Sequence, residues 1–156
     1  MELSIIFLPL IASIISGFFG RYIGDRNSEI VTSALVSISA LLSIHVLYQV
    51  IVNQYEENIV IATWISSGSL DVNWSMLIDP LSAVMLVVVT SVSALVHIYS
   101  IGYMSHDPHK PRFMAYLSLF TFAMLMLVTS DNFIQLFFGW EGVGLCSYFL
   151  IGFWFK

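Results

Sequence analysis

Charged residues are scarce in this chain. Only 5 Lys and Arg and 10 Asp and Glu occur among its 156 residues, which is 10%. A soluble domain needs roughly 25% charged residues to cover its surface toward water. Hydrophobic residues make up 58% of the chain, and the mean hydropathy is +0.90. This composition excludes a soluble domain and predicts an integral membrane protein.

The chain also lacks a basic run, a cysteine pair and any cofactor motif. Its net charge of −5 argues against nucleic acid as a partner, and its one cysteine, Cys146, can form no intrachain disulfide. No phosphate loop, dinucleotide fingerprint, cysteine ligand set or nucleophile triad is found, so we expect no cofactor, no metal site and no redox catalysis. His106 and His109 flank Asp107 in a short, proline-rich loop that we interpret as solvent-exposed rather than metal-binding.

Long apolar segments are what the chain does contain. A helix needs about 20 apolar residues to cross roughly 30 Å of hydrocarbon. The segments do not alternate polar and apolar residues as the strands of a barrel would. We therefore predict an all-α transmembrane bundle with about five spans, near Leu3–Gly20, Ile30–Val52, Pro80–Tyr103, Phe113–Thr129 and Asn132–Phe155.

Local signals predict where these helices begin and end. Asp79-Pro80 places an N-cap acid before a proline that suits the first helical position. Asp131-Asn132 predicts the start of the fifth helix in the same way. Gly20 and Gly24 predict the end of the first helix.

The cations and the second loop predict the topology. With five spans, every Lys and Arg falls on one face of the membrane, which the positive-inside rule makes cytoplasmic. The N-terminus is then outside and the C-terminus cytoplasmic. Two β-prone runs, Ile61–Ile65 and Leu70–Trp74, predict a small external β-hairpin between helices two and three, with a plain polar loop as the alternative. The five cations are Arg21, Arg26, Lys110, Arg112 and Lys156.

Glu141 is the first candidate functional residue. It lies nine residues into the fifth predicted helix, roughly 13 Å from its outer end and close to the middle of the membrane. An ionised carboxylate there costs about 3 kcal/mol unless it is paired, hydrated or protonated. Gly139, Gly142 and Gly144 would let another helix approach closely. The alternative is a neutral carboxyl that only links helices by hydrogen bonds.

Thr90, Ser93, His97 and Ser100 follow one another at steps of three, four and three residues. This spacing places them on one face of the third predicted helix. One interpretation is a hydrated stripe whose histidine exchanges protons near pH 7. The other is that the hydroxyls bond between helices while a backbone carbonyl satisfies His97.

Three segments carry a family resemblance: Leu77–Ser82, Val96–Met104 and Gly139–Tyr148. Together they resemble subunit L of proton-pumping NADH:quinone oxidoreductase (respiratory complex I), the counterpart of mitochondrial NADH dehydrogenase subunit 5. The resemblance covers essentially the whole chain and is densest from Trp74 onward. Trp140-Glu141 also occurs in the antiporter-like subunits M and N and in the sodium/proton antiporters built of several subunits, whereas the following run to Tyr148 is typical of subunit L.

The resemblance implies a membrane-arm subunit that contributes to proton translocation coupled to electron transport. It implies that Glu141 is a key ionisable group, with His97, Ser93 and Thr90 as further candidates, and that a lysine on a later helix pairs with the glutamate. It also implies a multi-pass location in the bacterial inner or mitochondrial inner membrane. The implied partners are the lipid bilayer and other membrane-arm subunits, especially an antiporter-like one.

We expect a single membrane domain over residues 1–156. Residues 1–112 correspond to the family's N-terminal region with three helices and the hairpin, and residues 113–156 to the start of its proton-translocating core, truncated after the fifth helix. Two other functions stay open: the corresponding component, termed A, of a multisubunit sodium/proton antiporter, and a non-conducting structural fragment that only packs against partner subunits.

Overall fold

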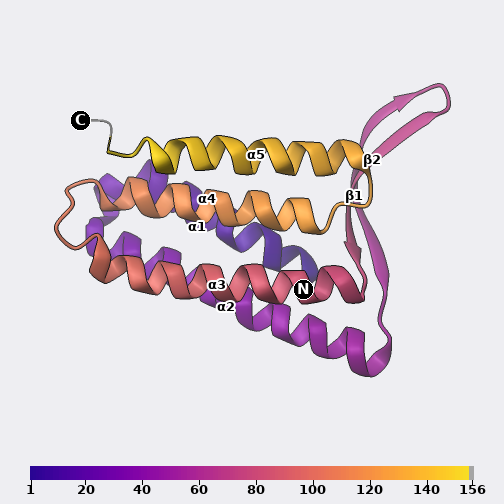
Figure 1. Cartoon of the computed structure of the whole chain (residues 1–156), viewed down its shortest axis with the longest axis horizontal. Helices are drawn as coiled ribbons and strands as arrows, with labels where there is room; N and C mark the ends of the chain where they lie inside the picture. Colours follow the sequence, from indigo (N-terminus) through magenta and orange to yellow (C-terminus); the bar gives the residue numbers. More distant parts are fainter. Residues whose placement is uncertain (155–156) are drawn as a thin grey trace.

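The computed structural model of the chain describes residues 1–154, which contain five helices and one two-stranded sheet (Figure 1). All five helices are long and apolar enough to cross a membrane. The predicted fold class is therefore confirmed. The elements are α1 (Glu2–Ile23), α2 (Asp25–Asn53), β1 (Glu57–Ser67), β2 (Leu70–Ile78), α3 (Pro80–Tyr103), α4 (Lys110–Val128) and α5 (Phe133–Ile151).

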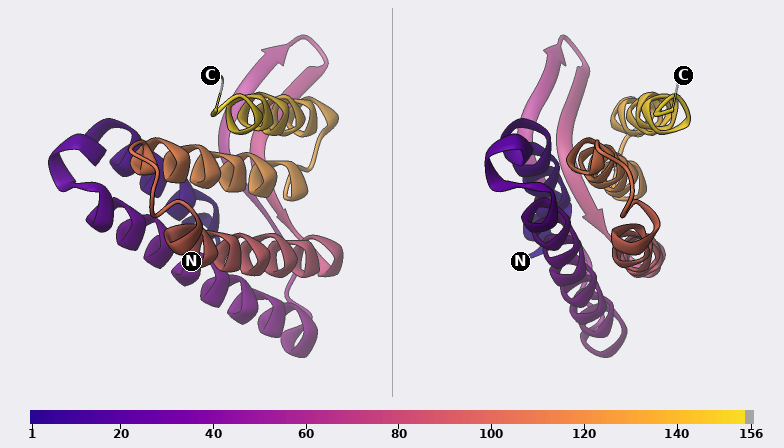
Figure 2. Two further views of the ribbon diagram at one scale, coloured as in Figure 1. Left: turned by 60° about the vertical axis from the view of Figure 1, so that its left-hand side comes forward. Right: turned by 90° about the vertical axis from the view of Figure 1, so that its left-hand side faces the viewer.

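Helices α1 to α4 pack against one another, and α5 lies along the outside of α4 (Figure 2). A hydrophobic cluster near the hairpin joins α1, α2, α3 and α4 to β2. Most large apolar side chains elsewhere are exposed, as expected of helices whose outer surface meets lipid. The buried members of the cluster are Ile5, Ile6, Val46, Val50, Met76, Ile78, Ala83, Leu86, Leu125 and Met126.

The start of α3 forms the predicted cap. Asp79 accepts a hydrogen bond from the Ser82 N–H at 2.6 Å, and the Ser82 hydroxyl oxygen accepts one from the Asp79 N–H at 2.9 Å. This reciprocal pair is a capping box, with Pro80 at the first helical position. The Ser82 N–H holds the pKa of the Asp79 carboxyl below its ordinary value.

Gly20 does not end α1, which corrects one predicted boundary. The helix continues to Ile23, and Gly24 ends it with φ 87°. Gly20 is instead a packing position, because a Cβ there would lie 2.6 Å from the Pro111 Cβ. A turn signal and a close-packing signal look alike in sequence, since both call for glycine.

The two ends of α5 also differ in detail from the prediction. Asn132, rather than Asp131, is the N-cap and accepts a hydrogen bond from the Gln135 N–H at 2.8 Å. Asp131 accepts hydrogen bonds from the side chains of Asn58 and Asn132. The helix ends at Ile151, before the predicted end at residue 155, which lies outside the described residues.

The predicted β-hairpin is confirmed, with longer strands than expected. β1 and β2 pair antiparallel from Glu57 opposite Ile78 to Ser67 opposite Leu70, and Gly68 turns the chain with φ 63°. The hairpin crosses the end of the bundle opposite the α1–α2 and α3–α4 turns and projects beyond α5 (Figure 1).

The cations gather at the other end of the bundle. The Ser16 hydroxyl donates to the Pro111 carbonyl at 2.6 Å, which joins the end of α1 to the start of α4. Arg21 and Arg26 beside the α1–α2 turn therefore share an end with Lys110 and Arg112 at the start of α4. Which membrane face this end occupies stays a prediction.

Cysteine labelling tests the predicted topology. With Cys146→Ala as background, Gly68→Cys at the hairpin tip and Ser105→Cys in the α3–α4 turn should react with a membrane-impermeant maleimide from opposite sides. We expect Gly68→Cys to be labelled from outside and Ser105→Cys only after the membrane is opened. Labelling of both positions from the same side would contradict the five-span arrangement.

Candidate functional site

Glu141 lies at mid-length of α5. It is eight residues after Phe133 and ten before Ile151, so it is about 12 Å and 15 Å from the two ends at about 1.5 Å per residue. Its side chain is exposed, and within residues 1–154 it forms no ion pair or hydrogen bond. The predicted mid-membrane depth therefore agrees with the observed helix, and the group that would balance its charge lies outside the described structure.

Two glycines bring α5 against α4. A Cβ on Gly139 would lie 2.8 Å from the Leu127 Cα, and one on Gly142 would lie 3.2 Å from the Ala123 Cβ. Gly144 has no such neighbour within 4 Å. The close approach predicted around Glu141 is thus made by two of the three glycines, on the side of α5 turned away from Glu141.

The polar stripe of α3 faces inward. Thr90, His97 and Ser100 are buried, and Ser93 is half-buried. The Thr90 hydroxyl lies 2.7 Å from the Ser43 hydroxyl of α2. On the other side, the Ser93 hydroxyl is hydrogen-bonded to the Thr121 hydroxyl of α4. The stripe therefore links α3 to both neighbouring helices.

Both ring nitrogens of His97 have partners. Nδ1 lies 2.7 Å from the Ser93 carbonyl oxygen, and Nε2 lies 3.0 Å from the Ser118 hydroxyl of α4. A neutral ring fits this arrangement, because Nδ1–H can donate to the carbonyl while Nε2 accepts from the hydroxyl. The geometry is that of the second interpretation of the stripe, and a proton-exchanging part for His97 stays a prediction.

Glu141 and the stripe are not brought together. α4 lies between α3, which carries His97, and α5, which carries Glu141 (Figure 2). Glu141 also faces away from α4, so no direct contact joins the two candidates within this bundle.

Two further polar residues were not predicted. Gln135, near the start of α5, is fully buried, and Glu29, near the start of α2, is 5% exposed. The Glu29 Oε1 atom has no hydrogen-bond partner in the described structure. Because α2 begins at Asp25 rather than near Ile30, Glu29 lies inside the helix; its four-residue spacing from Ser33 was the signal available in the sequence.

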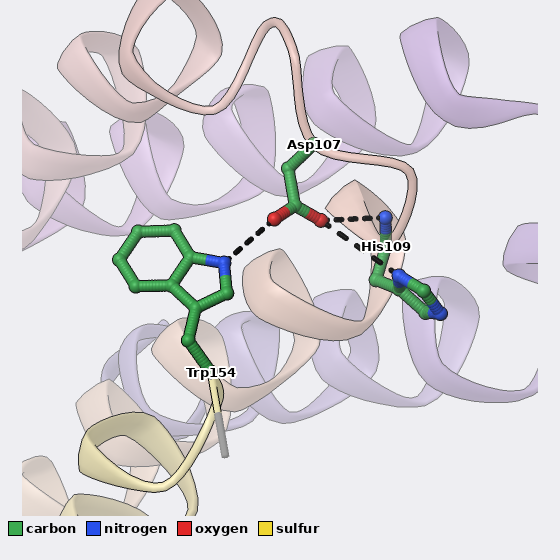
Figure 3. Close-up of polar contacts among 3 residues, drawn as sticks. All are labelled: Asp107, His109 and Trp154. Atoms are coloured by element: carbon green, nitrogen blue, oxygen red, sulfur yellow. Dashed lines mark hydrogen bonds and ion pairs between the residues drawn. The ribbon is translucent and has the colours of Figure 1, made fainter. Parts of the chain in front are cut away.

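The loop between α3 and α4 is tied to the chain after α5 (Figure 3). Asp107 accepts a hydrogen bond from the Trp154 indole N–H at 2.7 Å and another from the His109 backbone N–H at 2.7 Å. The His109 ring is exposed, with Nδ1 3.9 Å from the same carboxylate. No group of three or more potential metal ligands occurs in the described part of the chain.

The Asp107–Trp154 contact should weaken in acid. The indole N–H of Trp154 lowers the pKa of the Asp107 carboxyl from its ordinary value. Since the folded pKa is the lower one, the contact stabilises fully at neutral pH and is lost as pH falls through that lowered pKa. We expect acid to change tryptophan fluorescence in the native chain and to change it much less in Asp107→Asn. Equal responses of the two chains would contradict this assignment.

These features define a multi-spanning membrane protein with an ionisable residue at mid-depth. Residues 64–114 match the family model for the N-terminus of chain 5 of NADH-ubiquinone oxidoreductase (complex I). The chain is 58% identical over 155 residues to NADH-ubiquinone oxidoreductase chain 5 of Arabidopsis thaliana, covering 99% of this chain and 23% of that protein. The chain 5 proteins of Triticum aestivum and Phytophthora infestans are 57% and 55% identical, also over 23% of their length.

The resemblance predicted from the motifs is therefore confirmed: the chain carries the N-terminal region of complex I chain 5 and is related to chain 5 proteins along nearly its whole length. It spans about a quarter of the length of these relatives. This relationship and the five span-length helices support the predicted multi-pass location in an inner membrane.

Proposed function

We propose that the chain is part of a membrane-arm subunit of NADH:quinone oxidoreductase and that Glu141 exchanges protons there, coupled to electron transport. The observation that carries this proposal is the place of Glu141: mid-length in α5, exposed, and on the side turned away from α4. The chain carries out no redox step itself. Its part in the enzyme is proton movement.

The open face of α5 supports a contact with further helices. Large apolar side chains surround Glu141 on this face. A carboxylate facing lipid at mid-depth would cost about 3 kcal/mol, whereas a helix carrying a cation would stabilise it. We propose that this face meets another membrane-arm element, such as a helix with a lysine or an antiporter-like subunit. The exposed residues are Phe133, Phe137, Trp140, Leu145, Tyr148 and Ile151.

A supporting part is proposed for Thr90, Ser93 and His97. Hydroxyl and imidazole groups run from Ser43 of α2 through this stripe to Ser118 and Thr121 of α4. Such a chain can pass a proton only if its hydrogen bonds reorient. The occupied ring of His97 equally suits a purely structural link, which is the observation favouring the non-conducting alternative.

The test is to replace Glu141 with glutamine in the assembled enzyme and to measure protons translocated for each NADH oxidised. Loss of translocation with intact NADH oxidation supports the proposal. An unchanged ratio would instead support a non-conducting role. The antiporter alternative predicts that sodium gradients, rather than NADH, drive the Glu141-dependent proton movement.

A further inference from the structure

Gln135 holds α5 to the hairpin. Its fully buried amide donates from Nε2 to the Ser75 carbonyl at 2.7 Å and accepts at Oε1 from the Ser75 N–H at 3.0 Å. Ser75 lies in β2 opposite Val60 of β1. A residue in an antiparallel strand directs its N–H and C=O to one side. The amide therefore occupies the side of β2 that faces away from β1, as a third strand would.

Two more hydrogen bonds follow the same edge of β2. The Asn132 side chain donates to the Asn73 carbonyl at 2.9 Å, and the Leu77 N–H donates to the Thr129 carbonyl at 2.8 Å. Asn73, Ser75 and Leu77 are alternate residues, so all three present their backbone groups to the α4–α5 connection. The beginning of α5 is thus fixed to the strand.

The anchored residue lies on the face of α5 that packs on α4. Gln135, Gly139, Gly142 and Cys146 are separated by four, three and four residues, which places them in one row. Gly139 and Gly142 contact α4, and Cys146 is buried. Glu141 is two residues beyond Gly139, about 200° around the helix at about 100° per residue.

We propose that Gln135 is a positioning residue: its two hydrogen bonds to Ser75 set the rotation of α5 about its axis and so direct Glu141 to the open side. This inference rests on the proposed function of Glu141. A leucine at position 135 would keep most of the volume but leave the buried Ser75 N–H and C=O without partners. The start of α5 would then turn to expose them, and Glu141 would turn with it.

Disulfide formation can report the rotation directly. In the complete chain with Cys146→Ala, the pair Ala123→Cys and Gly142→Cys should cross-link readily. A Cβ on Gly142 would lie 3.2 Å from that of Ala123, slightly below the roughly 3.5–4.5 Å usual for a disulfide. The pair Ala123→Cys and Val143→Cys should cross-link poorly, because position 143 is about 100° further around.

Gln135→Leu should lower the Gly142→Cys yield at least threefold relative to Val143→Cys and raise the latter yield. The matched control is Gln49→Leu, because Gln49 bonds only side chains of its own helix. A native ratio in Gln135→Leu would overturn the proposal. Loss of both cross-links without a shift from one position to the other would also overturn it, since that result means general loosening.

Gln135→Glu gives a second test if the leucine variant fails to accumulate. A protonated carboxyl can both donate to and accept from Ser75, whereas a carboxylate cannot donate. The native cross-link ratio should therefore return at low pH and shift at high pH, relative to the native glutamine at each pH. A pH-independent native ratio overturns the proposal. The cross-link does not depend on proton movement, so it can fail while Glu141→Gln still abolishes translocation, and the reverse also holds.

Discussion

Glu141→Gln in the assembled oxidoreductase should close the proton pathway that uses this residue while NADH oxidation by a water-soluble acceptor continues at the native rate. Proton transfer by a positioned side chain is worth roughly 10²–10⁴-fold in rate, and glutamine has nearly the same shape but cannot ionise. Protons translocated for each NADH oxidised should therefore fall by the share that this pathway carries. The measurement is acidification of sealed vesicles, followed with a pH-sensitive dye.

The matched control is Glu56→Gln. Glu56 is an exposed carboxyl between α2 and β1, outside the spans, so its loss should leave the translocation ratio unchanged. Glu141→Asp retains an acid on a shorter side chain and should keep part of the activity. If Glu141→Gln translocates normally, the carboxyl is a structural group and the proposed function is wrong.

Gly139→Ala should be strongly destabilising, and Gly144→Ala should not. The added methyl at position 139 would lie 2.8 Å from both the Cα and the Cβ of Leu127. Backbone atoms cannot swing aside, so α5 must move away from α4, at a cost of about 1–3 kcal/mol. Position 144 is open, and alanine in a helix interior is favoured over glycine by about 0.5–1 kcal/mol.

Thermal unfolding in lipid-like micelles would separate the two variants. We expect a clearly lowered midpoint for Gly139→Ala and a native or slightly raised one for Gly144→Ala. Similar midpoints for the two chains would mean that the α4–α5 contact is looser than the structure shows.

Hydropathy predicted the helices because a span has one strict requirement: a long apolar segment whose backbone groups bond internally. Cap chemistry predicted the start of α3 for a similarly local reason, since Asp79 and Ser82 satisfy each other within four residues. The hairpin followed from alternation on either side of a turn at Gly68. These features depend on neighbours in sequence, which a single chain displays directly.

Partners across helices could not be predicted in this way. Spacing placed His97 and Thr90 on one face of α3, but nothing local names Ser118 or Ser43 as their partners. The same limit applies to the candidate site: Glu141 was found from its charge and depth, whereas the side of α5 on which it lies is decided by contacts that Gly139 makes with α4.

The hydrogen bonds between Gln135 and Ser75 join groups 60 residues apart. When the hairpin is first synthesised, its outer edge has no such partner, because α3 and α4 must be made and inserted before α5 begins. Until then, water must satisfy the backbone groups of Asn73 and Ser75. The order of membrane insertion is thus written into the hairpin: it remains an open edge, available to pair wrongly with another chain, until the fifth helix closes it.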